Sequence, residues 1–187
     1  MITICMIRHG QTDWNKAKLI QGRLDNKLND TGISQAKNTG LRLKEIDSNW
    51  DIIISSPLSR CIDTANIIKD ILNYQGDIII NYDVIEREFG EAEGKDITDE
   101  IYQKINNDEI RGIEKVKDLQ ARSYNAVMEI AAKYNNKKIL IITHSHFIKG
   151  FYTYIDSNIT FTTRLDNASL NYVKINNNEI IEHNFNQ

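Results

Sequence analysis

The sequence predicts an α/β fold in which a largely parallel sheet is covered by helices on both faces. Two observations lead to this prediction. Short, almost continuously apolar segments recur along the chain, and amphipathic segments with helical spacing separate them. Uninterrupted apolar runs are typical of strands buried on both faces, and their alternation with helices indicates a parallel sheet between two helical layers. A length of 187 residues suits a single domain with an insertion.

The first half of the chain reads as strand, helix, strand, helix. Residues 2–7 form an apolar run, and a helix is expected to begin at Asp30-Thr31-Gly32 and end near Asp47. Residues 51–55 predict a second strand, and Ser56-Pro57 opens the next helix. Proline in a first turn lacks only an N–H that would be unpaired anyway. The apolar face of that helix comprises Ile62, Ala65, Ile68, Ile71 and Leu72.

The second half begins with a predicted strand at 77–81, followed by a polar, acidic excursion with one short helix. A long amphipathic helix is expected at 116–134, a buried strand at 138–143 and a helix at about 146–155. Two strands, 170–176 and 179–184, flank an Asn-rich turn that is typical of a hairpin. The expected organisation is one domain, residues 1–187, with a lid insertion at about 86–114.

The composition argues against several classes of function. The formal net charge is −3 and no basic run is present, so no nucleic-acid partner is expected. No apolar stretch reaches the ~20 residues of a membrane-spanning helix, and the short N-terminal run does not resemble a signal peptide. We therefore expect a cytoplasmic protein without a membrane partner. Cys5 and Cys61 are expected to be buried free thiols.

Charged side chains follow each of the four predicted parallel strands. Arg8 and His9 follow the first, Arg60 lies five residues after the second, Glu86 follows the third and His144 the fourth. Right-handed crossovers bring the carboxyl ends of parallel strands to one edge, where ligands of open α/β sheets bind. Because guanidinium groups match phosphate oxygens, two arginines in one small site indicate a phosphate-binding pocket.

These residue types also suggest a reaction. A neutral imidazole is a competent nucleophile toward phosphorus, and two nearby arginines should lower the pKa of His9 from the usual ~6.5. Attack would give a phosphohistidine and an alkoxide, which a neutral Glu86 could protonate before taking a proton from water as a carboxylate. A protonated His144 would stabilise charge on the equatorial oxygens, and Asn15 could donate a further hydrogen bond.

Six blocks of sequence together resemble the histidine phosphatase superfamily, in its phosphoglycerate-mutase-like branch. They cover nearly the whole chain in the same order: RHGQTDWN at 8–15, Gln21-Gly22, LNDTGISQA at 28–36, SSPLSRCIDTA at 55–65, EREFGEAEG at 86–94 and ITHSHFIKG at 142–150. The resemblance implies a three-layer α/β/α sandwich with a mixed, mostly parallel sheet. It implies no metal and no other cofactor.

The resemblance also assigns roles. It implies His9 as the phosphorylated nucleophile, Glu86 as the proton donor, and Arg8, Arg60 and His144 as the catalytic phosphate pocket. The substrate-binding residues that we expect in addition to Arg8 and Arg60 are Asn15, Gln21, Gly22, Arg87 and Ser145. Ser145 and His146 stand where many relatives have glycine, so the pocket beside His144 should differ. Phe89, Ile101, Tyr102 and Ile105 could supply apolar walls.

Several alternatives stay open. A phosphomonoesterase acting on a small phosphorylated metabolite is favoured, because the excursion is short and acidic and Glu88 and Phe89 replace the His and Tyr usual in mutases. A 2,3-bisphosphoglycerate-dependent phosphoglycerate mutase is the second reading, since Arg87 could still contact a carboxylate. α-Ribazole phosphate is one candidate substrate. A metal site at His144-x-His146 and a phospho-ligand binding module without turnover are less favoured, and a homodimer is an option.

Overall fold

The computed structural model describes all 187 residues and contains one mixed six-stranded sheet. The strand order is β3-β2-β4-β1-β5-β6. Four strands are mutually parallel: β1 (Ile2–Arg8), β2 (Ile52–Ser55), β3 (Ile78–Ile80) and β4 (Lys138–Thr143). The hairpin β5 (Leu170–Asn176) and β6 (Glu179–Asn184) adds two antiparallel strands at the β1 side. The predicted mixed, mostly parallel sheet is confirmed.

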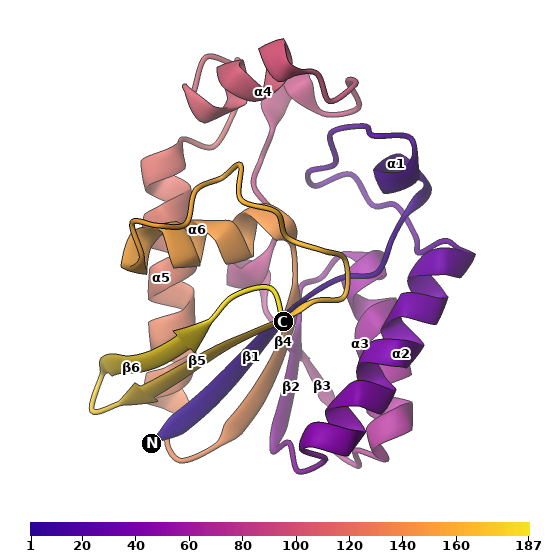
Figure 1. Ribbon diagram of the computed structural model, residues 1–187, viewed down its shortest axis with the longest axis vertical. Coiled ribbons are helices and arrows are strands. Elements are labelled where there is room, and N and C mark those ends of the chain that lie inside the picture. The colour runs from indigo at the N-terminus through magenta and orange to yellow at the C-terminus, as the bar shows by residue number, and fades with distance from the viewer.

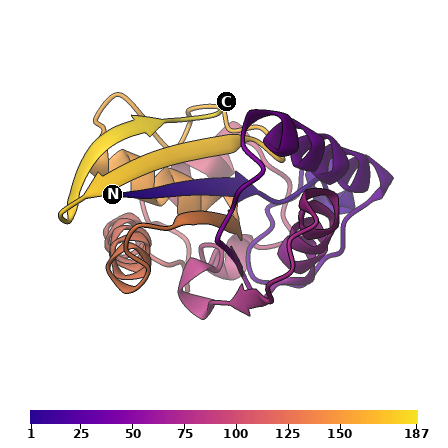
Figure 2. The same cartoon turned by 90° about the horizontal axis from the view of Figure 1, so that it is seen from below.

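Helices cover both faces of this sheet, as Figures 1 and 2 show from two directions. One layer consists of α2 (Asp30–Ile46) and α3 (Ser59–Leu72), and the other of α5 (Val116–Lys133) and α6 (Ser145–Ile155). Alternate residues of β1 serve the two layers. Ile4 and Met6 pack in the core beneath α5 and α6, while Cys5 and Ile7 pack in the core beneath α2 and α3. Because successive side chains of a strand point to opposite faces, the apolar residues of β1 contribute to both interfaces between sheet and helices.

The chain departs from the predicted boundaries at two places. Pro57 precedes α3 instead of lying in its first turn, because Leu58 is extended and serves as the N-cap. A four-residue helix, α1 (Asp13–Lys16), was not expected. Thr12 begins it with a capping box, in which the Thr12 hydroxyl accepts from the Asn15 N–H and the Asn15 side chain accepts from the Thr12 N–H.

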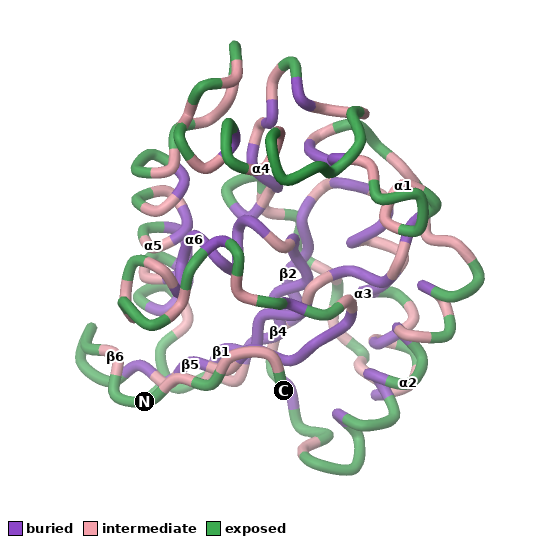
Figure 3. The backbone as a smooth tube through the Cα atoms, turned by 45° about the horizontal axis from the view of Figure 1, so that its top comes forward, coloured by how far each residue is buried: buried purple, intermediate pink, exposed green.

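The lid segment, residues 86–114, lies beyond the carboxyl ends of the parallel strands (Figure 1). It follows the short 3₁₀ helix η1 (Tyr82–Val84) and contains η2 (Gly90–Ala92) and α4 (Asp99–Asn106). The outer side of α4 is exposed (Figure 3). Ile105 is buried in a separate small core with Ile20, Phe89 and Ala92, so the segment packs on the loop that follows α1.

Two glycines fix the loop after β1 against α2. A Cβ on Gly10 would collide with the Gly32 carbonyl, and a Cβ on Gly32 would collide with the Gln11 carbonyl. Only glycine permits this backbone approach. The Gly10 N–H also donates to Thr64 Oγ1 of α3, at 3.1 Å. The residues that follow β1 are therefore held by both helices of one layer.

Cys5 and Cys61 are buried free thiols, as predicted. None of the helices combines the length and the apolar character that crossing a membrane requires.

Candidate active site

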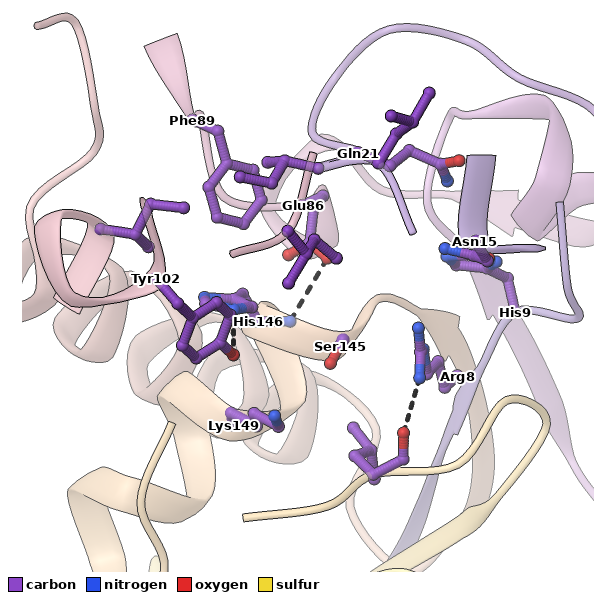
Figure 4. A pocket seen from close by; sticks show the side chains of 15 residues that line it. Arg8, His9, Asn15, Gln21, Glu86, Phe89, Tyr102, Ser145, His146 and Lys149 are labelled. Atoms are coloured by element: carbon purple, nitrogen blue, oxygen red, sulfur yellow. Dashed lines mark hydrogen bonds between the residues drawn. The ribbon is translucent and has the colours of Figure 1, made fainter. Parts of the chain in front are cut away.

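The parallel strands deliver the predicted residues to one edge of the sheet. His9 follows β1, and its N–H donates to Thr143 O at the end of β4, at 3.0 Å. His144 directly follows β4, and Arg60 lies in the first turn of α3. Above this edge is a pocket of about 220 Å³ (Figure 4). Its polar lining comprises Arg8, His9, Asn15, Gln21, Glu86, Tyr102, Ser145, His146 and Lys149.

The ring of His9 is fixed in one tautomer. The side chain is 3% exposed, and Nδ1 lies 2.7 Å from the carbonyl oxygen of its neighbour Gly10. A carbonyl can only accept, so Nδ1 carries the proton and Nε2 keeps its lone pair. Burial lowers the pKa of His9 well below 6.5, and the positive charges of Arg60 and Arg8 lower it further. A neutral ring with a free Nε2 is the nucleophilic form of histidine.

His144 lies beside His9, and their ring centroids are 5.3 Å apart. Its Nε2 lies 2.7 Å from Ser56 Oγ. Burial lowers the pKa of His144 well below 6.5, helped by the charge of Arg60. The ring is therefore neutral here, which differs from the protonated form that the sequence analysis considered. A phosphate dianion beside it would favour the protonated form, because opposite charges stabilise each other.

The two arginines occupy different positions. Arg8 lines the pocket, and its Nη1 donates to Leu165 O at 2.6 Å. Arg60 is completely buried, is not among the residues that line the pocket, and donates to Gly22 O at 2.6 Å and Leu24 O at 2.9 Å. The Nε atoms of both guanidinium groups are buried without a partner. Each therefore retains unused donor capacity close to His9.

Glu86 is held at the N-terminus of α6. Its carboxylate accepts from the backbone N–H of Arg87 at 2.8 Å, Phe147 at 3.2 Å and His146 at 3.3 Å. These donors and the arginines favour the charged form, but burial outweighs them and raises the pKa of Glu86 above 4.5. The result is a carboxyl group that stays protonated to higher pH than an exposed glutamate.

Of the expected substrate-binding residues, Asn15 and Gln21 line the pocket, whereas Gly22 does not. The Asn15 Oδ1 accepts from Thr12 N–H, and the Gln21 Oε1 accepts from Thr12 Oγ1 at 2.5 Å. With both oxygens engaged by Thr12, each amide NH₂ is left as a donor for a ligand. Gly22 instead accepts from Arg60 through its carbonyl and donates its N–H to Glu93, so it holds Arg60 in place.

Arg87 is not among the residues that line the pocket, although the sequence analysis expected it to bind substrate. Its side chain is completely buried, and Nη2 pairs with Asp108 Oδ1 at 2.8 Å. Its Nε donates to Glu114 O at 2.8 Å. Arg87 therefore ties together the two ends of the lid segment. Arg87 does not reach the pocket because it pairs with Asp108, which lies 21 residues further along the chain. The local motif around Arg87 does not reveal this partner.

Three polar lining residues belong to one wall of the pocket: Tyr102, His146 and Lys149. The Tyr102 hydroxyl lies 3.3 Å from His146 Nε2, and the His146 ring packs edge-on against Phe89. Of the predicted apolar walls, Phe89, Tyr102 and Ile105 line the pocket and Ile101 does not. Lys149 was not singled out from the sequence. Its position four residues after Ser145, on the same face of one helix, is the signal that could have found it.

The comparison with protein families agrees with this geometry. The profile described as "Histidine phosphatase superfamily (branch 1)" matches residues 4–187. The chain belongs to this superfamily. The predicted family is thus confirmed over nearly the whole sequence.

Individual members of the histidine phosphatase superfamily show how far the similarity extends. The uncharacterized phosphatase PhoE of Bacillus subtilis is 36% identical over 177 residues, which cover 93% of this chain and 89% of PhoE. The metal-independent phosphoserine phosphatase of Arabidopsis thaliana is 31% identical, covering 92% of this chain and 76% of that protein. The crystal structure of phosphoserine phosphatase from Entamoeba histolytica, in complex with 3-phosphoglyceric acid, aligns with a TM-score of 0.86 at 25% identity. That alignment covers 100% of this chain and 98% of the other. These likenesses support the predicted histidine-phosphatase-type phosphomonoesterase.

Proposed function

We propose that this protein hydrolyses small phosphomonoesters through a phosphohistidine on His9. The observation that carries the proposal is the state of His9: a neutral, buried ring whose proton is held on Nδ1 by Gly10 O. Its Nε2 is thereby available to attack phosphorus without a separate base. The pocket beside it is lined by Arg8 and Glu86, a cation for the phosphate and an acid for the leaving group.

In the first step, the Nε2 lone pair of His9 forms a bond to phosphorus as the bond to the ester oxygen breaks. Arg8 and Arg60 stabilise the charge on the transferring phosphoryl group. Glu86, whose pKa is raised by burial, gives its proton to the departing alkoxide. The products of this step are a free alcohol, phospho-His9 and the Glu86 carboxylate.

In the second step, water attacks the phosphohistidine. The Glu86 carboxylate takes one proton from the water as the new P–O bond forms and the P–N bond breaks. Inorganic phosphate leaves, His9 returns to its neutral form and Glu86 is protonated again. Protons and charge balance over the cycle, and every group involved is supplied by the chain.

The size of the pocket supports a small substrate. Its volume of about 220 Å³ is below the ~300–1,000 Å³ usual for drug-sized ligands. This favours small phosphorylated metabolites over a nucleotide-like ester such as α-ribazole phosphate. Two relatives are named phosphoserine phosphatases, which supports a substrate of that size.

The second candidate is a phosphoglycerate mutase. A mutase must retain a phosphorylated acid and return the phosphoryl group to it. The residue expected to hold its carboxylate was Arg87, and that guanidinium is engaged by Asp108. This observation favours hydrolysis.

The test is His9→Ala assayed with p-nitrophenyl phosphate in metal-free buffer. We expect turnover to fall by a factor of about 10³ or more, because the phosphoryl acceptor is lost. Phosphate trapped from rapidly quenched wild-type reactions should be acid-labile and map to the peptide that contains His9. Substantial turnover by the variant, or label on another residue, would reject the mechanism. Isomerisation of 3-phosphoglycerate primed with 2,3-bisphosphoglycerate, without phosphate release, would favour the mutase.

We also propose that the protein forms a homodimer. It is supported by the free edge of the sheet at β3, where Ile79, Ile80 and Tyr82 are exposed. Analytical ultracentrifugation can test this homodimer. A monomer at every concentration up to about 100 μM, which covers the usual range of dimer affinities, would reject it.

A further inference from the structure

Lys149 is a buried cation that the reaction described above does not use. It lies on α6, lines the pocket and is only 7% exposed. Its ammonium group has three N–H donors, and one of them donates to Phe161 O at 2.8 Å. None of the ion pairs of the chain includes it. Because a buried charge without a counter-charge is costly, it is rarely kept without a use.

The neighbours of Lys149 do not neutralise it. Burial and the charge of Arg8 lower the pKa of Lys149 to about 8, so the amine is still mostly protonated at pH 7. Burial lowers the pKa of His146 well below 6.5, so that ring adds no charge. The carboxyl group of Glu86 is the one acidic group that raises the pKa of Lys149, and the two side chains form no direct ion pair. The pocket therefore presents two cationic groups to a ligand, Arg8 and Lys149.

The two cations lie on different walls. Arg8 is beside His9, where the transferring phosphate must sit. Figure 4 shows Lys149 beneath His146, with its amino nitrogen turned towards Ser145 and Arg8. The Tyr102 hydroxyl and the Lys149 ammonium both donate to Phe161 O, at 3.0 Å and 2.8 Å. This shared carbonyl fixes the ammonium on the wall made by α4 and α6.

We propose that Lys149 binds a second anionic group of the substrate, a carboxylate, and so makes the enzyme selective for small phosphorylated acids. This inference rests on the proposed phosphomonoesterase function and names its substrate class. A carboxylate next to the phosphoester carbon would accept from the free donors of the ammonium while the phosphate meets Arg8 and His9. Arg87, the basic residue expected in this role, is paired with Asp108.

The decisive experiment compares Lys149→Met with the wild type on a matched pair of substrates. Phosphoserine carries a carboxylate, and phosphoethanolamine has the same phosphoester and amine without it. We expect wild-type kcat/KM to be higher for phosphoserine. In Lys149→Met that preference should shrink by about ten- to a hundredfold, the usual effect of losing a charge-assisted hydrogen bond from a buried site. The loss should appear mainly in KM, because Lys149 does not touch the reacting atoms.

Lys133→Met is the matched control, since it removes an exposed lysine of α5 from outside the pocket. It should leave the preference unchanged. Methionine can replace Lys149 without burying a new polar group, and a thermal melt of each variant establishes that it is folded. Because the readout is a ratio of two substrates on the same protein, a general loss of active enzyme does not alter it.

The outcomes separate the two proposals. If His9→Ala retains turnover of both substrates, the phosphohistidine mechanism fails whatever Lys149 does. If His9 is required but the wild type shows no preference for phosphoserine, the role of Lys149 is overturned alone. The same conclusion follows if Lys149→Met lowers kcat/KM equally for both substrates, which would place the ammonium at the phosphate or in a structural role.

Discussion

Glu86 is subject to two opposing influences. Two backbone N–H groups at the start of α6, the N–H of the following Arg87 and two arginines favour its carboxylate, while burial favours the neutral acid. Burial wins, and the pKa of Glu86 is raised above 4.5. The burial of this carboxyl group thus suits Glu86 to the proposed role of proton donor.

This balance predicts how activity depends on pH and on Glu86. In the proposed mechanism this carboxyl group donates a proton in the first step, so with an alkyl phosphate the rate should be full below the raised pKa and fall as pH rises through it. Glu86→Gln should lower kcat for alkyl phosphates by about a hundredfold or more, the range of general acid catalysis, and remove this alkaline decline. Stopped assays of phosphate release from pH 5 to 9 measure both effects.

The control for Glu86→Gln is the leaving group itself. p-Nitrophenolate needs little help from an acid, so its formation in a pre-steady-state burst should suffer much less than alkyl ester cleavage. Equal losses with both substrates would mean that Glu86 does not protonate the leaving group.

The residues at strand ends were predictable because their position follows from topology alone. Arg8, His9, Arg60, Glu86 and His144 meet since parallel strands share a carboxyl edge. The roles of Arg87 and Lys149 depend instead on contacts formed far along the chain, with Asp108 and Phe161. A sequence motif identifies such a residue, but it does not show which distant residue of the chain will bind its side chain in place of a ligand.

At the scale of elements, Gly32 shows packing prevailing over propensity. It lies in the first turn of α2, where alanine is the better helix former by up to ~1 kcal/mol. A Cβ there would collide with the Gln11 backbone, which cannot move without displacing the loop that carries His9. Gly32→Ala should therefore destabilise the protein by roughly 1–3 kcal/mol, the usual cost of overpacking, instead of stabilising it.

Urea unfolding at equilibrium measures this change in the free energy of unfolding. Ser34→Ala on the same helix is the control, because its hydroxyl bonds only to Asp30 O at the exposed surface. It should change stability by less than about 0.5 kcal/mol. An increase in stability for Gly32→Ala would contradict the close approach of the two backbones.

The elements that sequence analysis missed are those without periodicity. The helix α1 has four residues and no buried side chain, so no apolar pattern marks it, and its start depends on the Thr12–Asn15 capping box. The long helices α2, α3 and α5 were predicted to within a few residues because each must bury one face. A helix boundary that is set by a single capping residue, such as Leu58 before α3, cannot be located from the hydrophobic pattern alone.

At the scale of the whole molecule, two bodies of unequal size enclose the pocket. The sheet and its four long helices hold two large cores, whereas the lid segment contributes three of the four buried residues of a small core that it shares with Ile20. Phe89 and Ile105 belong to that small core and also line the pocket. The order of the lid segment therefore determines the position of these two pocket walls.

The polar tie that holds the lid segment is the contact of Asp108 with Arg87 and with the start of α5. Asp108 Oδ1 accepts from Arg87 Nη2 at 2.8 Å and from the Val116 N–H at 2.9 Å. Asp108→Asn keeps the shape and suits the positive φ of 59° at this position, but leaves the buried guanidinium of Arg87 without its charge partner. Because the Asp108 side chain is 26% exposed, the loss of stability should be modest, about 1–2 kcal/mol. It should affect local opening of the lid segment before it affects the sheet.

Hydrogen exchange read by mass spectrometry tests this division of the molecule. In Asp108→Asn, peptides from residues 86–114 should exchange several-fold faster, since about 1 kcal/mol of local stability changes an opening equilibrium by a factor of about five. Peptides from β1 and β4 should be unaffected, because their hydrogen bonds and core do not involve Asp108. Glu109→Gln makes the same chemical change at the exposed neighbouring residue and should leave both regions unchanged. Uniform acceleration throughout the chain would show that lid segment and sheet open as one unit, and the enclosure of the pocket would then depend on global stability instead of this single ion pair.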